Sequence, residues 1–395
     1  MKKVFLFWVV TLIGGLWPTL IACSDSNPMA PDFGNTGEDD TEEIKPGILF
    51  DWEKNRTEIL QSTDMVLLYA GGQQREKWDR KQVEPYLKYV DKEGKKHWLF
   101  DSFLFLEIVD TPDNWKSGKA FTKGYDAAFE SANKTDWERL IDAYFSANAG
   151  VTGLEYSLEL LKAEMNAPKH KHQVVIGIPE PMVNQFSANT SSPTKYWGKL
   201  GEEELDFSKA ADRVKACVWY IDQVRARFNE KKYKHVELAG FYWIAEDATA
   251  TRSILNTVGT YLQELKYSFN WIPFFNADGR AQWKDLGFTS AYYQPNYYFN
   301  DQTPKSRLTD ACKEAKKYGM HMEIEFEEDV LTRGNRLRDY MEVFKEQGIW
   351  ENNRLAYYQS NLALQFLKNS SDATAQALYH DFCQYVITRP IRDSH

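Results

Sequence analysis

The sequence has few cysteines, no nucleotide-binding motif and no excess of positive charge, and each deficit excludes a class of protein. Four cysteines among 395 residues are too few and too scattered for a disulfide framework or a zinc module. No G-x-G-x-x-G, P-loop, HExxH or EF-hand spacing occurs, so we expect no metal and no other cofactor. The 57 Asp and Glu residues outnumber the 48 Lys and Arg residues, which excludes a general electrostatic affinity for nucleic acid.

The remaining histidine and cysteine patterns predict structural roles. His170 and His172 form an H-x-H pair, but lysines flank both, which predicts a solvated connector rather than metal ligands. Cys217, Cys312 and Cys383 each lie among apolar neighbours in a helical pattern, so we expect buried free thiols.

The N-terminus has the pattern of an export signal. Lys2 and Lys3 precede an apolar run over residues 4–22, which ends on the letters LIAC at residues 20–23. This ending resembles a bacterial lipobox, which implies a signal peptide over residues 1–22 and a lipidated Cys23 as the mature N-terminus. An uncleaved membrane anchor is the alternative, but two glycines and a proline interrupt the run and suit a processed segment better.

Residues 23–47 predict a flexible tether, because prolines, glycines and an acidic cluster leave nothing there to bury in a core. The folded body is expected over residues 48–395. The chain is therefore predicted to be a lipoprotein of the cell envelope that is anchored to the outer membrane, at the cell surface or on the periplasmic face.

The body alternates short apolar runs with longer amphipathic stretches, a pattern that predicts an α/β fold. Eight such runs are each followed by a helical pattern, as in a (β/α)8 TIM barrel, and the runs are apolar on both faces, as buried parallel strands are. A doubly wound open sheet is the alternative architecture. The predicted strands are Met65–Ala70, Trp98–Leu106, Val174–Pro179, Val236–Ala245, Trp271–Asn276, Thr289–Gln294, His321–Phe326 and Leu355–Gln359.

Acidic residues follow several of these strands, at the end where barrel enzymes place their chemistry. Glu246 follows the fourth strand. In the seventh strand, Met322, Ile324 and Phe326 share one face, which turns Glu323, Glu325 and Glu327 inward. Glu323 is expected deepest, in a structural ion pair. Two facing carboxyl groups are the minimum for glycoside hydrolysis, so Glu246, Glu325 and Glu327 are the catalytic candidates.

Aromatic and amide side chains gather near the same strand ends. Aromatic rings stack on the apolar faces of sugars, and amides and carboxylates bind their hydroxyl groups, although many of these rings also serve to fill a barrel. Tyr297 lies beyond a proline and is expected to be an exposed platform for an oligo- or polysaccharide. The substrate-binding candidates are Trp243, Asn276, Asp278, Tyr293, Gln294, Asn296, Tyr297, Tyr358 and Gln359.

Three segments resemble a family of glycosidase-like, barrel-shaped bacterial lipoproteins that are associated with polysaccharide utilisation. The resemblance covers the body from about residue 48 to residue 387 and implies a carbohydrate context, without a settled substrate or catalytic assignment. The segments are Gly240-Phe241-Tyr242-Trp243, Tyr293-Gln294-Pro295-Asn296-Tyr297 and Glu323-Ile324-Glu325-Phe326-Glu327.

Three functions compete on this sequence. The leading hypothesis is a glycoside hydrolase, with retention of configuration favoured, that acts on a glycan outside the cytoplasm. A second is a non-catalytic glycan-binding lipoprotein with an aromatic cleft. A third is a scaffold or adhesin whose acidic residues at the strand ends are structural.

The lipid anchor can be tested without knowing the substrate. Mass spectrometry of the mature protein from its own host should find an acylated N-terminus at Cys23. An intact Met1 would contradict the prediction.

Overall fold

The computed structural model describes residues 47–112, 117–125, 128–187, 190–191 and 193–393. The predicted signal peptide, Cys23 and nearly all of the predicted tether lie outside these residues.

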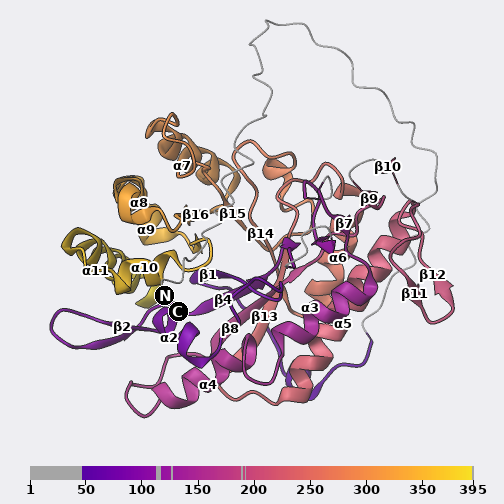
Figure 1. The fold of residues 1–395 in the computed structure, drawn as a ribbon, viewed down its shortest axis with the longest axis horizontal. Coiled ribbons are helices and arrows are strands. Elements are labelled where there is room, and N and C mark those ends of the chain that lie inside the picture. Colours follow the sequence, from indigo (N-terminus) through magenta and orange to yellow (C-terminus); the bar gives the residue numbers. More distant parts are fainter. Residues whose placement is uncertain (1–46, 113–116, 126–127, 188–189, 192, 394–395) are drawn as a thin grey trace, which may run out of the picture. The chain divides into compact units, whose positions relative to one another are not determined.

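Eight parallel strands form a closed barrel, drawn at the centre of Figure 1. Around the barrel the strands follow one another in chain order, and the last pairs with the first. The predicted TIM barrel is thereby confirmed, and the open doubly wound sheet is excluded. The strands are β1 (Asp64–Tyr69), β4 (Ser102–Leu106), β8 (His172–Ile178), β13 (Val236–Trp243), β14 (Ser268–Trp271), β15 (Ser290–Tyr293), β16 (His321–Glu325) and β17 (Leu355–Tyr358).

Helices and small sheets fill the connections between the barrel strands. The helices are α1 (Asp51–Lys54), α2 (Arg80–Leu87), α3 (Lys134–Tyr144), α4 (Val151–Leu161), α5 (Ala210–Lys231), α6 (Arg252–Glu264), η2 (Arg280–Gln282), α7 (Ser306–Tyr318), α8 (Val330–Glu346), α9 (Ile349–Asn352), α10 (Ala363–Asn369), α11 (Ala373–Ile387) and η3 (Pro390–Asp393). The small strands are β2 (Lys88–Val90), β3 (Lys96–Trp98), β5 (Val109–Asp110), β6 (Lys119–Ala120), β7 (Glu130–Ser131), β9 (Phe186–Ser187), β10 (Thr190–Ser191), β11 (Lys199–Leu200) and β12 (Glu203–Glu204).

Side-chain caps fix the starts of several helices. Asp372 accepts a hydrogen bond from the backbone N–H of Ala375 and so caps α11. At α3, Asn133 and Asp136 form a reciprocal capping box, in which each side chain accepts from the other's backbone N–H. These contacts satisfy N–H groups that have no partner within the helix.

Six predicted strands agree with the structure to within two residues at each end, and two differ by more. The fifth strand is β14 (Ser268–Trp271), whereas the sequence predicted residues 271–276. Pro273 has no N–H to give to the ladder, and Asn276 has a φ of 68°, so the regular strand ends at Trp271 and an isolated bridge between Phe274 and Gln294 follows it. The second predicted run divides into β3, which pairs with β2 in a hairpin, and the barrel strand β4.

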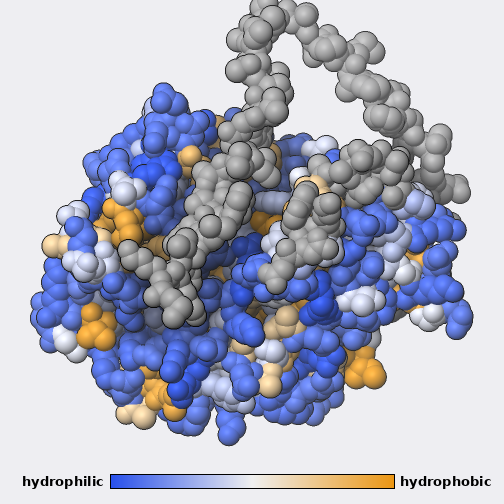
Figure 2. Space-filling view, in the orientation of Figure 1, coloured by the Kyte–Doolittle hydropathy of each residue, from blue (hydrophilic) through white to orange (hydrophobic). Residues whose placement is uncertain are grey.

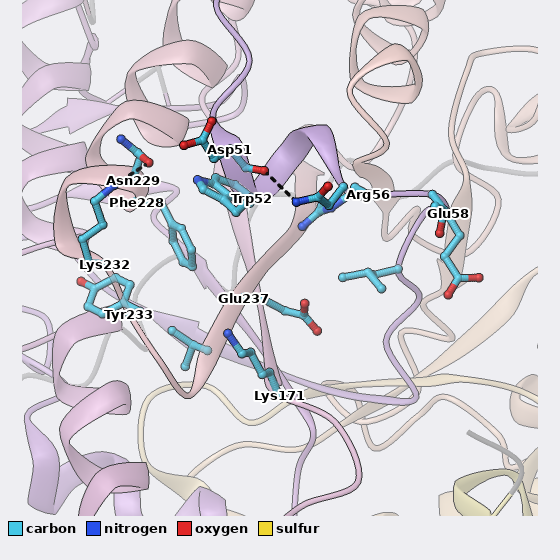
Figure 3. A pocket seen from close by; sticks show the side chains of 14 residues that line it. Asp51, Trp52, Arg56, Glu58, Lys171, Phe228, Asn229, Lys232, Tyr233 and Glu237 are labelled. Carbon is cyan, nitrogen blue, oxygen red and sulfur yellow. Dashed lines mark hydrogen bonds between the residues drawn. The ribbon is translucent and has the colours of Figure 1, made fainter.

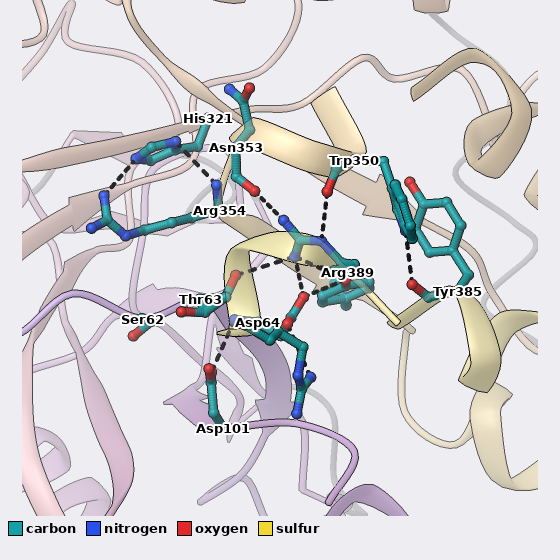
Figure 4. A network of polar contacts seen from close by, with 12 residues as sticks. Ser62, Thr63, Asp64, Asp101, His321, Trp350, Asn353, Arg354, Tyr385 and Arg389 are labelled. Carbon is teal, nitrogen blue, oxygen red and sulfur yellow. Dashed lines mark hydrogen bonds and ion pairs between the residues drawn. The ribbon is translucent and has the colours of Figure 1, made fainter. Parts of the chain in front are cut away.

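A buried network of charges closes the barrel between its first and last strands (Figure 4). Asp64, which begins β1, accepts hydrogen bonds from Arg389 and from the hydroxyl of Tyr357 in β17, the latter at 2.6 Å. Arg392 reaches the other oxygen of Asp64 at 3.0 Å. The segment after α11 is thereby bonded to the start of β1.

The cysteine prediction is confirmed, and one histidine prediction is wrong. Cys217, Cys312 and Cys383 are buried free thiols. His172, expected in a solvated connector, is buried as the first residue of β8, and burial lowers its pKa to about 3. His170 is exposed.

The face in Figure 2 is mainly hydrophilic, with small and scattered apolar areas. Scattered exposed apolar residues are ordinary for a folded domain, and the coloured part of this face shows no broad apolar patch. Among the described residues, no helix is long and apolar enough to cross a membrane.

The closing network leads to a stability prediction. Asp64→Asn should lower the free energy of unfolding by about 3–5 kcal/mol, because it leaves buried guanidinium charge uncompensated. Denaturant unfolding followed by circular dichroism measures this. The control is Asp381→Asn, which breaks a half-exposed pair with Arg338 at 2.6 Å and should cost about 1 kcal/mol or less. Equal losses in the two variants would contradict the prediction.

Candidate active site

Strand β16 turns its acidic residues toward the barrel interior, as the alternation predicts. Phe326, just beyond the strand, packs outward on Phe382 of α11. Glu325 lies beside Tyr358 in the ladder, and the ring of Tyr358 meets that of Tyr69 from β1 at 6.2 Å inside the barrel. Glu323 and Glu325 therefore share the inner face.

Glu323 is fully buried, and the expectation that it forms an ion pair is wrong. Neither of its carboxyl oxygens has a hydrogen-bond partner, and no cation lies within ion-pair distance among the described residues. Burial, followed by the charges of Glu325 and Glu246, holds the pKa of Glu323 well above its ordinary value. The amide side chain of Gln294, at the end of β15, lies near enough to oppose this shift. Burial and the neighbouring carboxyl groups thus favour the protonated form of Glu323.

Glu325 is as deeply buried as Glu323, but more hydrogen-bond donors lie near its carboxyl group. The hydroxyl of Tyr340 on α8 donates to one of its oxygens, while the other oxygen has no partner. Burial raises the pKa of Glu325 to about 8, opposed by Tyr340 and by the backbone N–H groups of Asn296 and Tyr297. Because Glu323 and Glu325 repel each other's charge, one ionises before the other, and these donors favour Glu325.

Glu246 lies three strands around the barrel from β16, in the loop after β13, and is exposed to solvent. The surrounding protein displaces part of its water and raises its pKa to about 7, and the neighbouring charge of Asp247 adds to this shift. The side chain of Gln294 opposes the shift, as it does for Glu323. Gln294 is thus the amide that both carboxyl groups share.

Glu327 lies further out and is half-buried. It accepts a hydrogen bond from the hydroxyl of Tyr358 at 3.1 Å, and burial raises its pKa. The next residue, Glu328, accepts from the backbone N–H groups of Asn361 and Leu362, both at 2.9 Å. Glu327 is therefore the more accessible acid of this strand end.

An arginine–carboxylate pair lies beyond the ends of β1 and β4. Arg75 donates from Nε and Nη2 to the buried Glu107, at 2.9–3.1 Å, and from Nη1 to Asn361 at 2.9 Å. The backbone N–H of Gly72 adds a bond to Glu107 at 3.1 Å, and a Cβ at Gly72 would lie 2.3 Å from that carboxyl oxygen. The guanidinium also lies 4.6 Å from the ring centre of Tyr69.

Four aromatic residues remain accessible, at least in part, around these carboxyl groups. Phe299 is 40 % exposed and contacts Tyr358 edge to face. Tyr125 is 39 % exposed, and the nearby charge of Glu246 adds to the effect of burial in raising its pKa. Tyr69 and Tyr358 are half-buried. Of these four rings, Tyr358 is among the predicted substrate-binding residues, and the other three were not predicted.

The predicted platform at Tyr297 is wrong, because Tyr297 is buried. Its hydroxyl donates to Asp339 at 2.7 Å, and the guanidinium of Arg336 lies 3.7 Å from its ring centre. Both partners belong to α8, which holds the loop after β15 against the barrel. Tyr293 is also buried, and its hydroxyl donates to Glu314 of α7 at 2.5 Å.

Other predicted binding residues point away from the barrel axis or have partners of their own. Trp243 is buried against Phe269 on the outer face of the strands. Asp278 is exposed but paired with Arg252 of α6 at 2.8 Å. Gln359 is buried and accepts from Tyr86 of α2 at 3.0 Å.

Two predicted asparagines have structural roles. Asn296 bonds Gln294 at 3.1 Å and caps the backbone N–H of Phe275 at 2.8 Å, so it supports the shared amide. Asn276 is exposed, and its backbone N–H donates to the hydroxyl of Tyr293 at 3.0 Å.

Sequence reasoning missed several residues of this site. In β13 the inward ring is Tyr242, whose pKa is raised by burial and by the charges of Glu246 and Glu323, and its neighbour Trp243 points outward. Tyr242 points inward because a bulge between Leu238 and Gly240 shifts the alternation of inward and outward side chains along β13. The pattern of apolar and polar residues does not indicate this bulge. Glu107 stood at a predicted strand end, but its pairing with an arginine in another loop had no sequence signal.

A pocket of about 630 Å³ lies at the other end of the barrel (Figure 3). It is lined by Trp52, by Glu237 at the start of β13 and by Arg56, which stacks 4.5 Å from the ring centre of Tyr267. Its acidic and basic side chains balance in number, and this end of a TIM barrel serves stability rather than catalysis. The carboxyl-rich C-terminal end is therefore the candidate active site.

A family model described as "Domain of unknown function (DUF4855)" matches residues 64–384, from β1 into α11. The chain belongs to this family. No curated protein matches the chain. Strands β1 to β17 and all the carboxyl groups described above lie within the DUF4855 segment.

Solved structures with a similar fold are remote from this DUF4855 protein. A mutant tryptophan synthase alpha-subunit from Pyrococcus furiosus is 12 % identical, with a TM-score of 0.36, over 83 % of this chain and 97 % of that one. The carboxyl transferase domain of Rhizobium etli pyruvate carboxylase is 8 % identical, with a TM-score of 0.34, over 88 % and 54 %. Likenesses at this distance carry no argument about the reaction.

The raised pKa of Glu325 gives a pH dependence of stability. The folded DUF4855 domain binds the proton of Glu325 more tightly than the unfolded chain does. The stability that this proton contributes to the fold is therefore fully present below about pH 4.5 and is lost as the pH rises through about 8. Relative to Glu325→Gln, the wild type should lose up to about 1.4 kcal/mol of unfolding free energy per pH unit in this window.

Denaturant titrations at several pH values measure this loss. Glu346→Gln is the control, because Glu346 is exposed on the same helix as Tyr340. Parallel stability curves for wild type and Glu325→Gln would contradict the prediction.

Proposed function

We propose that this protein is a glycoside hydrolase that acts on an oligo- or polysaccharide outside the cytoplasm, held at the outer membrane by a lipid on Cys23. The observation that carries the proposal is one exposed carboxyl group, Glu246, facing buried carboxyl groups of β16 across the C-terminal end of a TIM barrel. Glycoside hydrolysis needs one protonated and one ionised carboxyl on either side of the scissile bond.

The electrostatics supply the proton that glycoside hydrolysis needs, and the exposure of the groups assigns their roles. With pKa values raised to about 7 and about 8, Glu246 and Glu325 together retain at least one proton near neutral pH. In the free protein the higher pKa leaves the proton on Glu325 more often than on Glu246, so Glu325 acts as the nucleophile or base after this proton has passed to Glu246. Tyr340 and two backbone N–H groups stabilise the carboxylate that results. Glu246 is exposed to the incoming glycan and is the proton donor.

The accessible aromatic rings support a sugar as the ligand. Phe299, Tyr358 and Tyr69 form a chain of edge-to-face contacts beside Glu327, and Tyr125 lies near Glu246. Such rings offer flat apolar faces to sugar C–H groups next to carboxylates that bind hydroxyl groups. The arrangement would also suit a protein that only binds glycans, so turnover has to be measured directly.

The test starts with a screen of the purified protein against a glycan library for binding and for release of reducing ends. Glu246→Gln and Glu325→Gln should each lower kcat by about 10²- to 10⁴-fold or more, because each removes a proton-transfer or nucleophilic group. Circular dichroism checks the fold, and Glu346→Gln is the matched control. Binding without turnover in the wild type would contradict the hydrolase and favour the binding protein.

A second comparison tests the roles. Glu246→Ala should keep activity on aryl glycosides whose leaving group needs no proton, whereas Glu325→Ala should lose it. If Glu327→Gln is inactive while Glu325→Gln is normal, Glu327 is the partner of Glu246.

A further inference from the structure

Carboxyl groups without a cation dominate the C-terminal end of the barrel. Among the described residues there, Arg75 is held by Glu107, and Arg333 is held by Asp329 and Asp301. Arg213 is buried near Glu180, and its guanidinium donates to the backbone oxygen of Ala250 and to Ser253. Lys123 is exposed and lies beside Glu180. Within the part of the chain that the structure describes, no ion pair is formed by the other acids of this end, which are Glu180, Glu246, Asp247, Glu323, Glu325, Glu327 and Glu328.

Glu323 shows that the unpaired acidic side chains at this end are more than a solvated rim of the barrel. It is fully buried on the inner face of β16, and both of its oxygens lack a hydrogen-bond partner. An unpartnered carboxyl group in such a place costs several kcal/mol if it is ionised. A proton relieves this cost in the free protein, and a positively charged ligand would relieve it in a complex.

A single metal ion does not match the arrangement. No group of three or more His, Cys, Asp or Glu side chains within the described part of the chain is close enough to hold one. The acids are instead spread over the ends of β8, β13 and β16. The matching positive charges must likewise be spread along the ligand.

We propose that the substrate is a glycan with free, protonated amino groups, such as a polymer of de-N-acetylated hexosamine. This inference rests on the proposed function and adds the charge class of the substrate. A protonated amine donates charge-assisted hydrogen bonds to carboxylates such as Asp247 and Glu327. N-acetylation removes both the charge and two of the donor hydrogens, and a uronic acid would be repelled.

A competing explanation is that the acids serve only the positive charge that develops on the sugar during glycoside cleavage. In that case neutral glycans would bind and react as well as cationic ones. The probes that separate the two explanations are glucosamine oligosaccharides, the same oligosaccharides after N-acetylation, and oligogalacturonates of equal length, together with the glycan that the library screen selects.

Calorimetric titration of the mature protein should give at least about 10-fold tighter binding of the glucosamine series than of its N-acetylated form, as expected for one charge-assisted hydrogen bond. Binding should weaken as salt is added. Asp247→Asn and Glu327→Gln should each reduce this preference. The control Glu346→Gln, which removes a distant exposed carboxylate, should leave it unchanged.

The outcomes distinguish this inference from the proposed function. Equal or better binding or cleavage of the N-acetylated or galacturonate series, or of a neutral glycan selected by the screen, would overturn the amine preference and leave the hydrolase intact. Selective binding of the amine series without cleavage would support the preference and overturn the hydrolase. Failure of every glycan to bind would overturn both.

Discussion

The buried contact between Asp64 and Arg389 is the constraint on which the barrel depends. A closed parallel sheet has no free edge only if its last strand pairs with its first, and here the charges of Arg389 and Arg392 join the two at the N-terminal end. Tyr357 completes the contact from β17. Every residue of the opposite end owes its position to this closure, because neighbouring strands fix each other's register.

The two ends of the barrel differ in whether their buried acidic residues are paired with a cation. At the N-terminal end, the buried acid Asp64 is paired with two arginines. At the C-terminal end, Glu323 and Glu325 are buried, and no described residue forms an ion pair with either. A fold can carry such an unfavourable arrangement only when the rest of the structure supplies the stability, and unfavourable arrangements of this kind gather where a protein binds or reacts.

The sequence predicted what depends on local pattern and missed what depends on distant packing. Eight apolar runs were enough to predict the barrel, and the interleaved apolar residues of β16 were enough to turn its acids inward. The burial of Tyr297 could not be predicted, because Arg336 and Asp339 come from a helix about 40 residues later in the chain. The inward position of Tyr242 depends on a bulge. The pair of Arg75 and Glu107 depends on two loops meeting in space.

The long separation of Arg389 from its partner along the chain also sets when the lock can form. Its partner Asp64 lies 325 residues earlier. The ring of strands cannot close until β17 has been synthesised, and the lock cannot form until synthesis has reached Arg389. Until β17 is made, the edges of β1 and of the newest strand stay open, and a growing chain in this state is exposed to aggregation. A chain that stopped between β17 and Arg389 would therefore hold all eight barrel strands but lack the arginine that locks the first to the last.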